Sequence, residues 1–150
     1  MTRTIGYDVK PDLKLVHITV KRLAETPIRQ GDVVSIGSFT SNVIPCTNAT
    51  VPFGVACNAV SAEAIAAYEA GYGGEDYIEV IVCLSGVCPV LAGEPLSENT
   101  WVGVDSDSRV IDATSVSMEI IGFTLHNPAG DGVQTSIFVH RVPPGARGGK

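Results

Sequence analysis

Short runs of β-branched and other apolar residues recur along most of this chain, and glycine, proline or aspartate turns separate them. The longest run, residues 77–84, alternates so that Ile78, Val80, Val82 and Leu84 share one face. Successive side chains of a strand point to opposite sides, so this alternation favours a strand with one wholly apolar face. The sequence therefore predicts a mainly β fold, either a small β-barrel or a β-sandwich.

The same criteria locate the other strands. We expect them at residues 14–21, 33–36, 42–44, 53–56, 119–125 and 134–141, with a hairpin formed by 100–104 and 109–113 around an Asp/Ser turn. The 77–84 strand is expected to continue past a bend at Ser85 and Gly86, which would place Pro89 near a sheet edge. Trp101 and Phe53 belong either to the core or to an interface, and we expect the core, since buried aromatic residues are ordinary.

One segment has a different composition. Residues 61–70 are rich in helix-forming residues, with Ser61 as a candidate N-cap and Gly71 directly after the end. We expect one short helix there, packed over a barrel end or a sheet edge. The chain then divides into an N-terminal arm with the first strand (1–27), a barrel or sandwich domain (28–142) and a C-terminal tail (143–150).

Size and hydropathy are consistent with one globular domain. The 150 residues are 45% hydrophobic, which is enough for a substantial core. No apolar run approaches the roughly 20 residues needed to span a bilayer, and the first residues lack the apolar stretch of a secretory signal. We expect a soluble protein that is synthesised in a cytoplasm.

The four cysteines, Cys46, Cys57, Cys83 and Cys88, form no C-x-x-C pair, and no histidine lies between the first and the last. This spacing argues against a zinc site. A reducing cytoplasm favours free thiols, so we expect four small buried side chains.

Charge is distributed unevenly along the chain. Residues 1–30 carry six basic and three acidic side chains, a net +3, whereas residues 31–140 carry thirteen acidic side chains and only Arg109, a net −12. Residues 141–150 contribute a further +3. The acidic body argues against nucleic-acid binding, and the basic ends are candidate contacts to an acidic neighbour. The basic residues of the first part of the chain are Arg3, Lys10, Lys14, Lys21, Arg22 and Arg29.

Catalytic motifs are missing from the sequence. It contains no G-x-S-x-G, H-E-x-x-H, P-loop or G-x-G-x-x-G pattern. Asp105 and Asp107 alternate like calcium ligands, but the rest of an EF-hand loop is absent, so a hairpin turn is the better interpretation. We expect no catalytic residue, no cofactor and no metal site, although a Cys–His nucleophile using Cys83 or Cys88 stays an alternative.

An ordered set of short motifs between residues 28 and 142 resembles the head decoration (capsid cement) proteins of tailed bacteriophages. The helix at 61–70 and the length of segment 1–27 depart from the family pattern. The motifs, in chain order, are Gly31–Val34, Pro52–Ala56, Glu79–Val82, Leu84–Val87, Gly93–Leu96, Trp101–Val104, Ile121–Thr124 and Ile137–Arg141.

The resemblance implies a non-enzymatic virion protein on the outer capsid surface. Such a protein binds the expanded shell at junctions between major capsid protein subunits and stabilises it, as a homotrimer in preference to a dimer. A basic N-terminal arm that orders on the coat, adding a strand at Lys14–Lys21 to an exposed edge, fits this role. The alternatives are another virion module, such as a head fibre base or minor tail protein, and a small β-barrel ligand-binding protein or enzyme.

Overall fold

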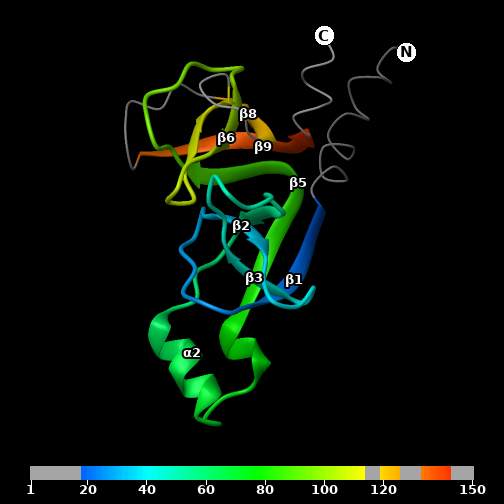
Figure 1. Cartoon of the computed structure of the whole chain (residues 1–150), viewed down its shortest axis with the longest axis vertical. Helices are drawn as coiled ribbons and strands as arrows, with labels where there is room; N and C mark the ends of the chain where they lie inside the picture. Colours follow the sequence, from blue (N-terminus) through cyan, green and yellow to red (C-terminus); the bar gives the residue numbers. More distant parts are fainter. Residues whose placement is uncertain (1–17, 114–118, 126–132, 143–150) are drawn as a thin grey trace, which may run out of the picture.

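The computed structural model describes residues 18–113, 119–125 and 133–142, which form a mainly β fold with one α-helix (Figure 1). The predicted fold class is therefore confirmed. The elements are β1 (Ile18–Ala24), β2 (Val33–Ile36), β3 (Asn42–Pro45), β4 (Gly54–Ala56), α2 (Ala62–Glu69), the 3-10 helix η1 (Glu75–Ile78), β5 (Glu79–Leu91), β6 (Trp101–Val104), β7 (Val110–Asp112), β8 (Ile120–Thr124) and β9 (Gln134–Val142).

Five strands close into a barrel. They follow the order β1-β3-β2-β4-β5, and pairing of β1 with β5 completes the ring. The barrel interior is filled by small branched side chains with no solvent exposure, among them Val34, Val43, Val80 and Val82. Closure pairs strands that lie far apart in sequence, since Ile18 faces Ser85. Barrel closure also uses residues 18–21 of the strand that was predicted to add to the coat, Lys14–Lys21. Because Ile18–Ala24 already pair within the barrel, they cannot add to another sheet without leaving β5.

Strand β5 is shared by two sheets. Its first half pairs with β1 and β4 in the barrel, and its second half pairs with β9 in a sheet of order β5-β9-β8-β6-β7 (Figure 1). The bend between the halves lies at Gly86, whose φ of +116° favours glycine. The predicted continuation past Ser85 and Gly86 is confirmed. Pro89 lies in the second half, where the described strand pairings involve one side of β5 only, as a residue without an N–H requires.

A second apolar cluster joins the two sheets. Val33, Val55 and Cys83 contribute to it from the outside of the barrel, and the inner face of the second sheet covers them. The members from that sheet include Cys88, Val90, Val102, Val104, Val110, Ile121, Ile137 and Val139. The barrel and the second sheet therefore share one core and stabilise each other by burial.

Helix α2 packs at the end of the barrel, as predicted. The Ser61 hydroxyl accepts a hydrogen bond from the backbone N–H of Ala64 at 3.1 Å, which caps the first turn. Ile65 and Tyr68, three residues apart, pack against the barrel core, and Phe53 joins them as expected for a core residue. Figure 1 shows the helix at the opposite end of the molecule from β6, β8 and β9.

Two sequence-based expectations were wrong, the burial of Trp101 and the free thiols of Cys83 and Cys88. Trp101 is 41% exposed, because it lies on the outer face of β6 while its neighbour Val102 points into the core. Cys83 and Cys88 form a disulfide instead of remaining thiols. Residues five apart on a regular strand point to opposite sides. Here β5 contains a bulge, because Ile18 faces Ser85 and Thr19 faces Cys83, which leaves Leu84 as an extra residue between them. The bulge brings both sulfur atoms to the same side.

The thiol count tests this correction. Protein purified without reductant and then unfolded should titrate two thiols, those of Cys46 and Cys57, and four after reduction. Four thiols before reduction would contradict the disulfide.

The close approach of β8 and β9 gives a second test. A methyl group on Gly122 would collide with the carbonyl oxygen of Phe138, which is rigid backbone. Gly122→Ala should lower the free energy of unfolding by about 1–3 kcal/mol, measured by denaturant titration. The control is Gly74→Ala, where the nearest atom to the added methyl is Oδ1 of the exposed Asp76, the far end of a flexible side chain that can move away. Equal stability of the two variants would contradict the proposed close packing.

Candidate functional site

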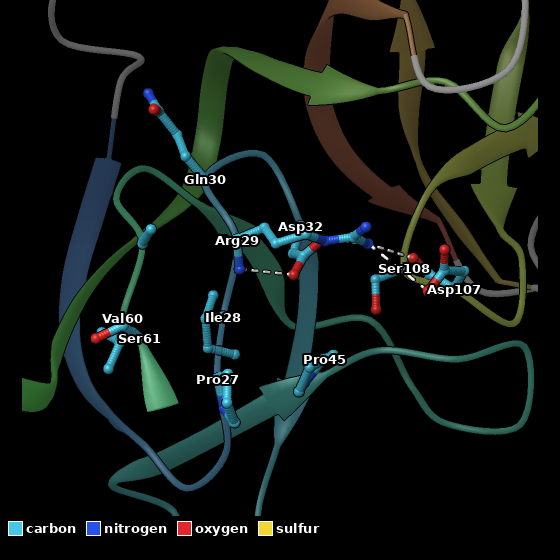
Figure 2. A pocket seen from close by; sticks show the side chains of 11 residues that line it. Pro27, Ile28, Arg29, Gln30, Asp32, Pro45, Val60, Ser61, Asp107 and Ser108 are labelled. Atoms are coloured by element: carbon cyan, nitrogen blue, oxygen red, sulfur yellow. Dashed lines mark hydrogen bonds and ion pairs between the residues drawn. The ribbon is translucent and has the colours of Figure 1, made fainter. Parts of the chain in front are cut away.

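An open groove of about 540 Å³ lies in the surface of the described residues. It lies between the loop that precedes β2, the start of α2 and the turn between β6 and β7 (Figure 2). Its walls combine apolar side chains with one charged cluster. The lining residues are Pro27, Ile28, Arg29, Gln30, Asp32, Pro45, Ala59, Val60, Ser61, Asp107 and Ser108.

Arg29 organises the charged part of the groove. Its backbone N–H donates to Asp32 Oδ2 at 2.8 Å and its Nε donates to Asp32 Oδ1 at 3.0 Å, which closes a tight turn. Its Nη2 donates to the carbonyl oxygen of Asp107 at 2.8 Å, and Figure 2 shows the side chain reaching across to that turn. Gly31 lies inside the loop with a φ of +92°. We call Arg29, Asp32 and Asp107 the arginine clasp.

Burial and hydrogen bonding act in opposite directions on the Asp32 carboxyl group of the clasp. Asp32 is only 2% exposed, and this burial raises the pKa of its carboxyl group, while the hydrogen bonds from Arg29 act in the opposite direction. The bond to Asp32 in turn raises the pKa of Arg29. Both oxygen atoms of the carboxylate accept bonds from Arg29. Both oxygen atoms of Asp32 are therefore already engaged by Arg29.

Next to the clasp, backbone bonds join the barrel to the second sheet. The N–H of Val33 donates to the carbonyl oxygen of Ser108 at 3.1 Å, and the Ser108 hydroxyl donates to the carbonyl oxygen of Cys46 at 2.6 Å. The Asp105 carboxylate accepts from the backbone N–H of Asp107 and of Arg109, which shapes the predicted hairpin turn. The groove floor is thus the junction between the two sheets.

Of the six predicted contact residues, the structure describes Lys21, Arg22 and Arg29, and Arg29 lies apart from the other two. Arg3, Lys10 and Lys14 lie outside the described residues. The exposed Lys21 amine is 3.9 Å from Glu79, Arg22 stacks over the Phe53 ring, and Arg29 belongs to the clasp. Lys21 and Arg22 do line a smaller hollow of about 290 Å³ together with Glu75 and Glu79. Their assignment as contacts to a capsid or a neighbouring copy stays a prediction.

Sequence reasoning missed Asp32, Asp107 and Ser108 as partners in one cluster. It recognised the Asp/Ser turn that contains Asp107 and Ser108, but 75 residues separate Asp32 from Asp107, and no local pattern indicates that two distant turns meet.

The described residues contain no group of three or more His, Cys, Asp or Glu side chains that could hold a metal ion. Burial raises the pKa of the Cys46 and Cys57 thiols, which keeps them protonated and poorly nucleophilic. His140 lies exposed on β9, next to Trp101 at a ring separation of 6.3 Å. Neither helix in the described segments is long and apolar enough to cross a membrane.

Comparison with known proteins identifies a shared fold. No protein-family model matches the sequence, and no curated protein shows significant similarity to it. The structure is similar to the crystal structure of the head fiber gp8.5 N base in bacteriophage phi29. The TM-score is 0.57 at 13% sequence identity, and the similarity covers 83% of this chain and 94% of the other. This chain therefore has the fold of that fiber base.

The geometry of the clasp predicts that Arg29 acts in folding. Arg29→Lys keeps the charge but loses the fork that bonds Asp32 and Asp107 together, so the free energy of unfolding should fall by about 1–3 kcal/mol. Lys21→Met removes a charge whose side chain is 71% exposed and should change stability by less than about 0.5 kcal/mol. Chemical denaturation of both variants measures the difference, and a fully stable Arg29→Lys protein would refute the structural role.

Proposed function

We propose that this chain is a non-catalytic structural protein of a phage virion, attached to the outside of the head. The observation that carries the proposal is the shared fold with a phage head fiber base, which extends over 94% of that chain. The order of motifs along residues 28–142, which resembles phage decoration proteins, supports the same class independently. Both lines concern phage head proteins, although they rest on different properties of the chain.

The state of the polar groups supports a non-catalytic role. The most buried carboxylate, Asp32, is held by Arg29, and the two free thiols have raised pKa values. A catalytic base or nucleophile needs a free atom and a pKa matched to its task. In the described residues, the charged groups of the groove instead bond one another, and they link the loop before β2 to the β6–β7 turn.

In the leading form of the proposal, the chain is a decoration protein. It binds the expanded shell where major capsid protein subunits meet. The unexpanded shell does not present these binding surfaces. A ligand that binds one state of an equilibrium stabilises that state. Many copies on a repeating lattice multiply a modest contact into a large gain in shell stability.

A head fibre base is the second candidate, and the fold similarity favours it specifically. A fibre base also binds the outside of the head, but it serves to anchor another segment. Decoration and anchoring therefore predict the same binding and different effects on shell stability.

Attachment is assigned to the basic N-terminal segment. Residues 1–30 carry a net +3 beside a body of net −12, so an acidic coat surface would attract the segment and repel the body. Arg3, Lys10 and Lys14 are the residues of this segment whose positive charge is proposed to contact the major capsid protein.

Co-sedimentation with heads tests the function. The full-length chain should pellet with expanded heads that lack it and not with unexpanded heads. Replacing Arg3, Lys10 and Lys14 by glutamine should weaken binding at least about tenfold, since three charge contacts are lost.

The matched control replaces Arg141, Arg147 and Lys150 by glutamine, which removes the same charge from the other end. Failure of the unmodified chain to bind any heads would overturn the virion role. Equal binding of both triple variants would overturn only the assignment to the N-terminal segment. Heads saturated with the chain should release their DNA at a higher temperature if it is a decoration protein, and at an unchanged temperature if it is a fibre base.

A further inference from the structure

An aromatic row crosses the outer face of the second sheet. The strand register places Val87 of β5 opposite Phe138 of β9, Phe138 opposite Phe123 of β8, and Phe123 opposite Trp101 of β6. Residues directly opposite each other in neighbouring strands point to the same side. These four large apolar side chains therefore form one continuous row, which we call the aromatic row.

The rings of the row touch one another and remain accessible. Phe123 stacks on Phe138 at a centroid distance of 5.5 Å, and Trp101 meets Phe123 edge to face at 5.2 Å. Val87 is 52% exposed and Trp101 is 41% exposed, although both are large and apolar. Mutual contact fixes the rings in place, so binding to this surface costs little side-chain entropy.

On β5 after Gly86, on β8 and on β9, the described residues that flank the row include no Asp, Glu, Lys or Arg side chain, and the Asp105–Arg109 ion pair lies at the far end of the β6–β7 hairpin. Every second residue of the second half of β5 and of the described part of β9, together with Leu125 after β8, completes this part of the face. The further positions are Ser85, Pro89, Leu91, Gln134, Ser136 and His140. Depletion of charge with enrichment of aromatic residues is typical of the centre of a protein interface.

We infer that this face is where copies of the chain associate with one another. The charge of the body supports a second copy as the occupant. Residues 31–140 carry a net −12, so two copies repel through most of their surfaces and can approach closely through an uncharged one. Closed symmetric assemblies bring identical faces together around an axis, where each aromatic row meets its equivalents.

The size of the face agrees with association of moderate strength. The exposed part of Trp101 alone amounts to on the order of 100 Å². The whole face then offers roughly 300–500 Å², comparable to the largest apolar patch of a typical monomer. With a polar border it approaches the roughly 600 Å² per partner found in small specific interfaces. Dissociation should therefore be observable by dilution through the micromolar range.

Trp101 is the single tryptophan of the chain and reports directly on this surface. Sedimentation velocity of the full-length protein should show an oligomer that dissociates on dilution. Over the same concentrations, acrylamide should quench Trp101 more strongly as its ring becomes accessible. This readout needs no variant, so it holds even if a substitution disturbs folding.

The decisive variant is Val87→Lys, which introduces a charge at the β5 end of the aromatic row, next to Phe138 and at an exposed position. It should raise the dissociation constant at least about tenfold. Tyr72→Lys is the matched control, because Tyr72 is 82% exposed, lies just after α2 and gains the same charge. The control should associate like the unmodified chain. Circular dichroism confirms that both variants fold.

The effect of ionic strength distinguishes association through the aromatic row from binding of the basic N-terminal segment of one copy to the acidic body of another. Screening reduces repulsion between the bodies, so association through the aromatic row should strengthen between low and physiological ionic strength, whereas an arm contact would weaken. A monomer at all concentrations, an oligomer unaffected by Val87→Lys, or unchanged quenching on association would overturn the inference. None of these measurements involves phage heads, so they leave the proposed virion function to its own test.

Discussion

The continuous strand β5 is the constraint on which the rest of the structure depends. Its first half completes the barrel with β1 and β4, and its second half supports the sheet that begins with β9. Thirteen residues thus provide backbone hydrogen bonds to both halves of the fold. Because Cys83 and Cys88 lie on either side of the bend and in one apolar cluster, the direction change is fixed by covalent bonding and by burial. The arginine clasp then ties the same two halves together at a second place.

Much of the fold could be predicted because its signals are local. Alternating side chains located most strands, the Ser61 cap and Gly71 located α2, and the Asp105–Ser108 turn located the β6–β7 hairpin. These signals depend on neighbouring residues only. The exposure of Trp101 could not be predicted, because it depends on which side of β6 the core occupies. The disulfide could not be predicted either, since it requires a bulge that forms only when β1 pairs with β5.

The candidate site also combines features with a local sequence signal and features that depend on distant parts of the chain. The Arg29–Asp32 turn has a local signature in Gly31, whereas the contact of Arg29 with Asp107 depends on the closed barrel and the second sheet together. Sequence charge alone gave Arg29 the same role as Lys21 and Arg22. In the structure its guanidinium group bonds the chain's own carboxylate and carbonyl groups. Positive charge in a sequence therefore identifies candidate contacts, but only geometry separates those that are already used internally.

The position of β9 in the chain also has a consequence for the order of events during synthesis. The barrel cannot close until Ser85 has been made, because it pairs with Ile18, and the aromatic row is incomplete until Phe138 follows. Both pairings span long stretches of sequence, which makes them slow to form. A truncated or partly folded chain lacks the finished row. Copies that recognise one another through it would consequently admit only partners in which β9 has been synthesised and has paired, so completion of the second sheet would precede assembly.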